Sequence, residues 1–570
     1  MKKGFQIIIT VLIFVLGIQV NNANGQTYCN PLNLSYQLTS DSPTRPDIAD
    51  PTIVLYKDNY FLFATNAGGY WYSGDLLSWK FVTASNLPFE KLAPTAFVIG
   101  DWIYFCTSLS NKIFRSKDPV NGSWEVYNSN SILLAQISDF TVFVDTDGRV
   151  FCYYGCSNHD GLMARELDPK NRLEPTGVPV VCQKLNPLKK NLQKLKSNPA
   201  KPVNNSVKGS WMNKYNGKYY YQCAELNSEL NSYGDAVYVS DKPLGPFTFA
   251  ANNPFSFKPD GFLSGAGNGS TFADKYGNWW HIGTMTAPKN QKSRTSFGLF
   301  PTGFDKDGNL FTKTDFGDYP IIMPASNYAN VSMLNPEWAL LSGNIAADAS
   351  SSLPSNPVTS AFDENIGTYW SAKTGKKGEW LMADLGSVCT INAFQLNFAE
   401  SKSQIIGSDS IFAYQYLVEY STDKKNWTKL NDKTFNTEYG TNPYEALKIP
   451  VQARYLKITN YQVPIGTFAI SGFRIFGLGS GRKPKKVTEF RAIRDYRNPQ
   501  IVKMSWKKQA NTKGYNIRYG TDKDKLHHSY QVYKDTRLNI HCPDKNRIYW
   551  FQMDAFNENG VTPGKPMLSK

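Results

Sequence analysis

The sequence predicts an all-β chain in which a five-bladed β-propeller is followed by two β-sandwich domains. Aromatic residues make up 14% of the 570 residues, which suits a chain rich in strands. Five similar hairpins recur in the first half of the chain, and two regions of short alternating strands follow them. A chain of this length is expected to form about three or four domains, each with its own core.

Residues 1–25 have the pattern of a secretory signal peptide. Lys2 and Lys3 precede an apolar stretch that ends in small and polar residues. We therefore expect the protein to be exported, so that it is periplasmic, bound to the cell surface or secreted. The later apolar runs are too short to cross a bilayer, and we expect no membrane span in the mature chain.

The predicted propeller covers residues 27–334. Each of its five hairpins pairs two short strands around a tight turn that contains Gly, Asn or Asp, which is the strongest local signal for a hairpin. A second strand pair follows most of them, so that two hairpins form a four-stranded blade. Five blades in a closed ring leave only short, protected edges. The hairpins lie at residues 52–65, 96–108, 142–155, 211–224 and 270–284.

A common spacing links these hairpins to a candidate site. Counting back eight residues from the first residue of each predicted turn gives Asp50, Leu92, Asp139, Lys208 and Asn268. Because the innermost strands of all blades line the central channel, the starts of these strands should converge on one mouth of it. Polar groups that converge in a concavity are typical of a functional site. The alternative is that strand-entry residues are polar because they leave loops.

Several segments resemble the five-bladed propellers of glycoside hydrolase family 43. They read DIADPTIVLYKDNYFLFAT, SDFTVFVDTDGRVFCYYG, GSWMNKYNGKYYYQ and GNGSTFADKYGNWWH, in this order along the chain. The resemblance implies an inverting glycosidase for plant-type glycans, in which one carboxylate activates water and a carboxylic acid protonates the leaving oxygen. By resemblance, Asp50 matches the base and Asp139 a third carboxylate near the acid, although Phe140 stands where the family usually has proline.

Two further residues are assigned to the same mouth by the resemblance. Trp211 and Asn268 are expected beside the substrate. Asn268 stands where related proteins carry a histidine that faces a central ion or water, so an inherited metal site is not expected here.

Lys208 occupies the position of the general acid. The family pattern is Glu-Gly, a small residue, Trp and Met, and this chain reads KGSWM. A lysine serves as an acid only if burial or neighbouring cations lower its pKa, whereas two nearby aspartates favour its ammonium form. Three explanations stay open. Glu225, or Glu229 after it, supplies the proton; the substrate needs little acid assistance or is itself acidic and recruits Lys208; or the chain is a catalytically inactive glycan-binding protein.

Residues 335–479 resemble discoidin-like domains, also known as coagulation-factor C-type or family-32 carbohydrate-binding modules. The resemblance rests on FDENIGTYW, ARYLKITNY and ISGFRIFG, and it implies a sugar-binding sandwich with Trp370 and Trp380 in the core or at strand ends. Asp363 and Thr368 match positions that often hold a structural calcium, although Gly472 replaces the usual later glutamate. No other cofactor is expected.

Residues 480–570 have a spacing of aromatic residues that is typical of a fibronectin type III sandwich, at Trp506, Tyr515-to-Tyr519 and Tyr549-to-Ala555. This domain is expected to act as a spacer. His527 and His528 are expected in a solvated loop rather than in a metal site.

The net charge of +15 invites a polyanionic partner. Nucleic acid is disfavoured, because no nucleic-acid module is recognisable and the protein is expected to be exported. The expected partner is a polysaccharide or oligosaccharide, with an acidic one left open, and the densest basic cluster, Lys184–Lys201, reads as a solvated loop. The eight cysteines are expected to be buried thiols, because Cys152 and Cys156 lack a second Cys or His pair at zinc spacing.

Overall fold

The computed structural model describes residues 25–35, 48–89, 91–157, 161–183, 208–227, 232–286, 295–399, 413–464, 466–542 and 544–569. Regular structure in these ranges is β, apart from three short 3-10 turns, η1 (Pro119–Asn121), η3 (Val331–Leu334) and η4 (Val358–Ala361). The all-β prediction is confirmed. No helix within these ranges is long and apolar enough to cross a membrane. Residues 1–24, the cluster Lys184–Lys201 and Glu229 lie outside the described residues.

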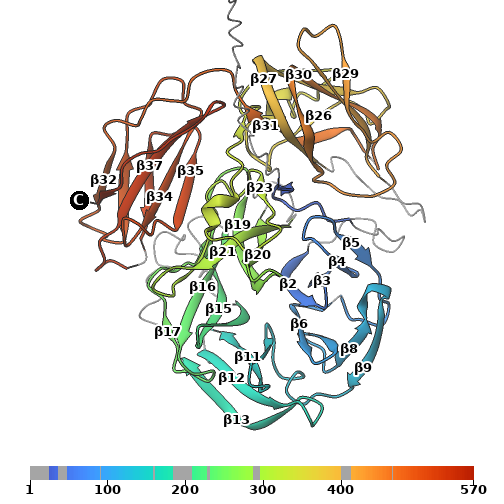
Figure 1. Ribbon diagram of the computed structural model, residues 1–570, viewed down its shortest axis with the longest axis vertical. Helices are drawn as coiled ribbons and strands as arrows, with labels where there is room; N and C mark the ends of the chain where they lie inside the picture. Colours follow the sequence, from blue (N-terminus) through green and yellow to red (C-terminus); the bar gives the residue numbers. More distant parts are fainter. Residues whose placement is uncertain are drawn as a thin grey trace, which may run out of the picture.

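Five four-stranded antiparallel blades form the propeller, as predicted (Figure 1). The innermost strands of successive blades contact one another in the order β2, β6, β10, β14, β19 and back to β2, so that the ring is closed. The blades are β2 (Ala49–Tyr56), β3 (Asn59–Thr65), β4 (Tyr70–Ser73) and β5 (Lys80–Val82); β6 (Pro94–Ile99), β7 (Trp102–Thr107), β8 (Ile113–Asp118) and β9 (Ser123–Asn128); β10 (Thr141–Val144), β11 (Val150–Ser157), β12 (Gly161–Asp168) and β13 (Glu174–Gln183); β14 (Lys208–Tyr215), β15 (Lys218–Asn227), β16 (Ser232–Ser240) and β17 (Thr248–Phe249), with β18 (Ser256–Phe257) added to β16; and β19 (Ser264–Ala273), β20 (Trp279–Thr286), β21 (Ser296–Phe304) and β22 (Leu310–Thr312).

The blades pack through aromatic and aliphatic side chains that alternate along their strands. One core cluster lies between blades one and two and includes Phe63, Tyr70 and Phe105. Seven cysteines, among them Cys106 and Cys152, are free and buried, which confirms the prediction for those seven. Separate clusters of buried side chains therefore lie between neighbouring blades around the ring.

An eight-stranded sheet follows the propeller. A short strand pair, β1 (Thr27–Tyr28) with β23 (Ile321–Ile322), ties the start of the described chain to the end of the propeller. Trp370 is fully buried in the core of the following sheet, as predicted. The strands of this sheet are β24 (Ala339–Leu340), β25 (Ala346–Ala349), β26 (Trp370–Ser371), β27 (Trp380–Phe398), β28 (Gln415–Ser421), β29 (Thr428–Asp432), β30 (Tyr444–Gln462) and β31 (Ala469–Leu478).

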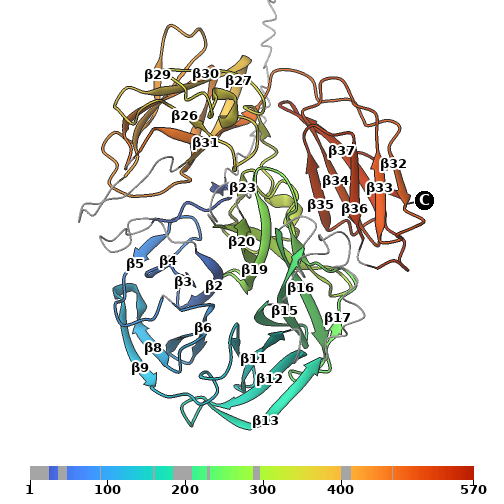
Figure 2. The same ribbon diagram turned by 180° about the vertical axis from the view of Figure 1, so that it is seen from behind.

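The C-terminal region is a sandwich of two sheets around one core that includes Trp506 and Phe551. The first sheet contains β32 (Arg491–Arg494), β33 (Ile501–Ser505) and β36 (Arg537–His541). The second sheet contains β34 (Gly514–Gly520), β35 (His528–Val532), β37 (Trp550–Asn557), β38 (Gly560–Thr562) and β39 (Met567–Leu568). The view from behind shows β35 on the side nearest the propeller and β32 at the outer edge (Figure 2).

A buried charge network joins all three parts of the chain. The Arg474 guanidinium, 1% exposed, donates to both carboxylate oxygens of Glu364 at 3.0 and 2.8 Å and to the Asp318 carbonyl. Lys258 lies 3.3 Å from the Asp318 carboxylate and donates to Gln531 at 2.9 Å. Burial alone would raise the pKa of Asp318, but Lys258 and Arg474 bring it below its usual value. Buried charges are tolerated only when paired in this way, so the network fixes how the three parts dock.

The prediction that His527 lies in a solvated loop was wrong. Its ring stacks on Phe311 of the propeller, with ring centroids 4.0 Å apart, and burial lowers its pKa. The neighbouring His528 begins β35 and packs against Tyr519. Both histidines therefore belong to packed surfaces, and the loop before β35 is a docking element.

Candidate functional site

Each innermost strand of the propeller has a residue with positive φ, in the left-handed backbone conformation, near its start, and in blade five Ala266 (φ 73°) also has positive φ. Positive φ is uncommon outside glycine, although Asn and Asp tolerate it best. The five residues are Asp50 (φ 55°), Ala93 (46°), Asp139 (51°), Gly209 (69°) and Asn268 (49°). Three of the five positions given by the eight-residue spacing, Asp50, Asp139 and Asn268, coincide with these residues, and the other two, Leu92 and Lys208, directly precede one of them.

Strand pairing shows why the eight-residue count does not reach the left-handed residue in blade four. In blade one, Ala49 pairs with Thr65 before a bulge, and Asp50 follows Ala49. In blade four, Lys208 pairs with Ala224 before the same kind of bulge, and Gly209 follows Lys208. The structural counterpart of Lys208 in blade one is thus Ala49 and not Asp50.

The hairpin turns explain how such slips arise. The first turn consists of Lys57 and Asp58, one residue earlier than predicted, because Tyr56 pairs with Asn59. Blades three and five have five-residue turns, closed by hydrogen bonds from the Asp145 N–H to the Arg149 carbonyl and from the Asp274 N–H to the Asn278 carbonyl. A fixed count from the turn therefore reaches different positions in different blades.

In four blades, the N–H of the left-handed residue donates to a side-chain oxygen of the preceding blade. This repeated hydrogen bond couples the start of each of these four strands to the preceding blade of the ring. The pairs are Asp50 to Thr284 at 3.3 Å, Ala93 to Thr65 at 2.9 Å, Asp139 to Ser108 at 2.8 Å and Asn268 to Asp235 at 2.7 Å. Backbone strain of this kind persists only where the surroundings enforce it, and it is common at functional sites.

The Asp50 carboxylate is held by side chains from two blades. The Thr65 hydroxyl of its own blade donates to Oδ2 at 2.7 Å, and the Asn268 amide of blade five donates to Oδ1. Thr65 also accepts the N–H of Ala93 from blade two. Both carboxylate oxygens have a donor, so the orientation of Asp50 depends on three blades.

Asp235 is a residue of the site that the sequence reasoning missed. It lies on β16 of blade four, is 2% exposed, and accepts the N–H groups of Asn268 at 2.7 Å and Gly269 at 3.2 Å. The buried His281 Nε2 lies 3.3 Å from its Oδ2. A carboxylate directly before the apolar run AVYV of this strand was the available signal. Asp235 fixes the left-handed turn at Asn268 and thereby the amide that holds Asp50.

Trp211 and Asn268 line one small polar cavity beside these residues. The Trp211 indole N–H donates to the Thr271 carbonyl at 2.7 Å, and Asn268 Oδ1 sits against Gly209, where an added Cβ would approach it to 2.3 Å. The cavity measures about 10 Å³, close to the space that a single water molecule needs, and its lining also includes Ser210, Gln222, Cys223, Ala224 and Asp235. The structure thus brings Asp50, Trp211 and Asn268 together.

The remaining predicted site residues are placed by their backbone. Asp139 is half-buried, and its N–H donates to Ser108 of blade two. Lys208 and Glu225 lie on the paired strands β14 and β15, but their side chains are outside the described part of the chain. Their roles stay predictions.

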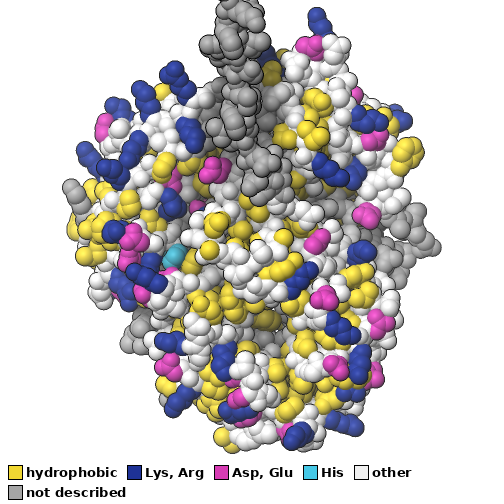
Figure 3. Space-filling model, in the orientation of Figure 1, with side chains coloured by type: hydrophobic (Ala, Val, Ile, Leu, Met, Phe, Trp, Pro, Cys, Tyr) yellow, Lys and Arg dark blue, Asp and Glu magenta, His cyan; other side chains and the backbone are white. Residues whose placement is uncertain are grey.

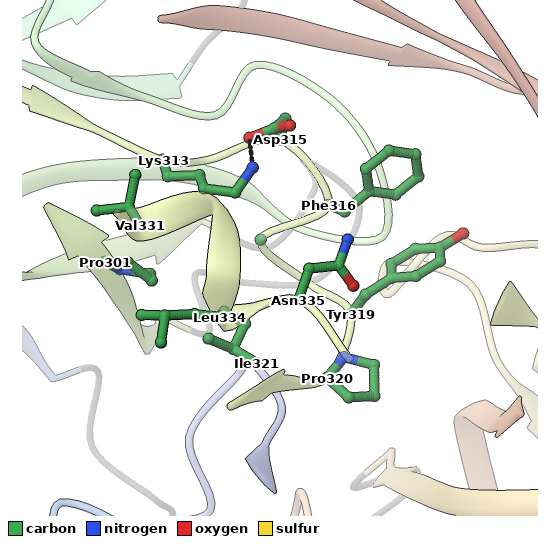
Figure 4. Close-up of a pocket in the computed structure, with 11 residues that line it drawn as sticks. Pro301, Lys313, Asp315, Phe316, Tyr319, Pro320, Ile321, Val331, Leu334 and Asn335 are labelled. Atoms are coloured by element: carbon green, nitrogen blue, oxygen red, sulfur yellow. Dashed lines mark hydrogen bonds and ion pairs between the residues drawn. The ribbon is translucent and has the colours of Figure 1, made fainter. Parts of the chain in front are cut away.

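A second pocket lies away from the propeller mouth, where β21 and η3 meet the segment 313–321 (Figure 4). Its side chains are mostly apolar, and its one ion pair joins Lys313 and Asp315 at 2.7 Å. It has a volume of about 20 Å³. The pocket is a small gap in the packing beside the segment 313–321. It contains none of the predicted site residues.

The residues predicted to hold calcium do not fit that ion. Asp363 accepts the Thr368 hydroxyl at 2.7 Å and the Asn365 N–H at 3.1 Å, so both its oxygens are engaged. The place of a third ligand is taken by the propeller, because a Cβ on Gly472 would lie 2.8 Å from the Phe262 ring. Calcium prefers six to eight oxygen ligands, and no cluster of three acidic, His or Cys side chains exists in the described ranges.

Two families match the chain. Residues 42–309 match the family described as Glycosyl hydrolases family 43, and residues 346–468 match the F5/8 type C domain. A β-xylosidase from Xylanibacter ruminicola is 28% identical over 159 residues, which are 23% of this chain and 42% of that protein. The chain thus spans less than half the length of this relative.

Solved structures with a similar fold include a glycoside hydrolase and an endo-1,4-beta-xylanase from Bacteroides thetaiotaomicron. The first is 18% identical, with a TM-score of 0.43 over 77% of this chain and 100% of the other. The second is 18% identical, with a TM-score of 0.39 over 49% of this chain and 97% of the other.

Replacing Asp235 by asparagine should destabilise the propeller. An amide has one accepting oxygen, so one of the two buried N–H groups loses its partner, at a cost of about 1–3 kcal/mol. Calorimetry of the full chain should show a lower unfolding temperature for Asp235→Asn. Asp241→Asn, an exposed change in the same blade, should leave it unaltered. An unchanged Asp235→Asn transition would contradict the role given to this carboxylate.

Proposed function

Residues 42–309 of this chain match the family described as Glycosyl hydrolases family 43, and from this premise we propose that the protein is an exported glycoside hydrolase. It cleaves glycosidic bonds in a plant-type polysaccharide or oligosaccharide with inversion at the anomeric carbon. The F5/8 type C domain that follows is proposed to bind the same kind of glycan. The observation that carries the proposal is the Asp50 carboxylate, held at the propeller mouth by Thr65 and Asn268.

In this mechanism Asp50 is the general base. It takes a proton from a water molecule that attacks the anomeric carbon on the face opposite the leaving group. The bond from that carbon to the glycosidic oxygen breaks as the new bond forms. A base must stand at a fixed place relative to the water, and the hydrogen bonds from two blades provide this.

Asp139 is proposed to act beside the acid position, where its charge would influence the proton donor. Lys208 occupies the acid position itself, so the chain lacks the usual carboxylic acid there. The match of KGSWM to the family pattern supports this reading. Because the leaving oxygen of a plant glycan is a sugar hydroxyl that must take up a proton, Glu225 on the paired strand β15 is proposed to donate it.

Replacing Asp50 by asparagine should abolish hydrolysis. An amide cannot accept the proton of the attacking water, and a general base typically contributes roughly 100- to 10,000-fold to the rate. The assay is sugar release from aryl arabinosides, aryl xylosides and plant oligosaccharides. Asp58→Asn, an exposed change in the turn of the same hairpin, should retain full activity. Full activity in Asp50→Asn would remove the base assignment, and an inactive wild type that still binds these glycans would favour a binding protein.

Replacing Lys208 by glutamate should raise hydrolysis of unactivated glycosides. The new carboxylic acid could protonate the leaving oxygen, whereas aryl glycosides, whose leaving groups need no proton, should change little. Lys208→Gln serves as the control, because it removes the charge without supplying an acid, and it should produce no increase. A loss of activity on both kinds of substrate in both variants would show that Lys208 itself takes part in the reaction.

A further inference from the structure

The positive charge of this chain is concentrated in its C-terminal sandwich. Residues 480–570 contain 20 of the 62 Lys and Arg residues but only 8 of the 47 Asp and Glu residues, so they carry +12 of the net +15. Figure 3 shows Lys and Arg side chains gathered over this part of the molecule, at the upper left. A spacer needs no such charge, and a field of one sign attracts polyanions.

The two sheets of the sandwich face different surroundings. The side that carries β35 docks on the propeller, through the stack of His527 on Phe311 and the hydrogen bond from Lys258 to Gln531. The sheet of β32, β33 and β36 can be followed in Figure 2, where β32 forms the outer edge of the molecule. Its inner side chains, such as Val502 and Ile540, are buried in the core. The opposite side of this sheet is free to meet a partner.

This outer face is formed by Arg491, Ile493, Lys503, Arg537 and Asn539, all of which are exposed. Arg491 and Arg537 both pair with Ser505, from either side of β33, so their Cα atoms stand about 10 Å apart. Among the described residues neither forms an ion pair, whereas Lys503 pairs with Asp495 at 2.5 Å. Two guanidinium groups are therefore available on one flat row.

A polar and aromatic rim adjoins the outer face. Tyr496, in the loop after β32, is 82% exposed, and Arg497 lies over its ring at 5.3 Å. An exposed ring beside hydrogen-bonding side chains suits a sugar, which offers apolar ring faces as well as hydroxyl groups. The guanidinium fork of arginine matches a carboxylate with two parallel hydrogen bonds.

We infer that the outer face binds an acidic polysaccharide, with Arg491 and Arg537 each receiving a uronate carboxylate. The inference rests on the proposed function, because a glycan-cleaving domain in the same chain makes a glycan the expected polyanion. Tethering the two domains to one polymer raises the effective concentration of substrate at the propeller. The surface thus adds a charge-dependent glycan contact to those proposed for the propeller and the F5/8 type C domain.

The test compares binding of the full chain to polygalacturonate and to the same polymer fully methyl-esterified, which keeps the backbone but loses the charge. Wild type should bind the free acid at least about tenfold more tightly, with an affinity that falls as salt rises. Arg491→Glu with Arg537→Glu should lose at least about tenfold of this binding. Arg491→Gln with Arg537→Gln should lose part of it.

Lys112→Glu with Lys170→Glu is the matched control, because it makes the same charge change at two exposed propeller lysines. It should bind as wild type does. The inference would be overturned if the variant Arg491→Glu with Arg537→Glu bound polygalacturonate as tightly as wild type does. It would also be overturned if wild type bound the esterified polymer as tightly as the free acid. Equally tight binding of single-stranded DNA would overturn it as well, because it would show a general attraction to polyanions. Hydrolysis of aryl glycosides by the variant should be unchanged, so a failure here is separable from a failure of the proposed function.

Discussion

In four blades, the hydrogen bond that the left-handed residue donates to the preceding blade organises the starts of the innermost strands. It ties the start of one innermost strand to a side chain of the neighbouring blade, at Thr284, Thr65, Ser108 and Asp235 in turn. A residue with positive φ is costly unless its surroundings hold it, and here the ring itself supplies the support. The same residues that close the ring present Asp50 and Asp139 at its mouth, so that fold and candidate chemistry share one set of contacts.

Much of this arrangement was predictable from the sequence, because hairpins leave strong local signals. The five hairpins, each recognised by its turn, predicted the five blades. Counting back eight residues from the predicted turns reached Asp50, Asp139 and Asn268. The count stopped one residue before the left-handed position at Leu92 and Lys208, and it reached Asp50 only because the first turn lies one residue earlier than predicted. Asp235 was missed for another reason: it acts on a backbone turn in the next blade, and such long-range hydrogen bonds have no local pattern.

Contacts between the domains were also beyond the reach of sequence reasoning. Gly472 was known to replace a glutamate, but only the structure shows that the Phe262 ring of the propeller fills the space. His527 likewise belongs to a docking surface instead of a solvated loop. The buried charges that reach across the domain boundaries, Arg474 to the Asp318 carbonyl and Lys258 to Gln531, explain why this docking is specific, since each charge would be costly without its partners. The sandwich therefore keeps its basic outer face turned away from the propeller.

The central claim is that Asp50, fixed by its neighbours, delivers water directly to the anomeric carbon. The most direct test is the anomeric configuration of the sugar first released, followed by proton NMR before mutarotation. Direct attack by water inverts this centre, whereas a covalent intermediate retains it. The account predicts an inverted first product from wild type. A retained configuration would contradict it, because Asp50 would then act as a nucleophile and not as a base.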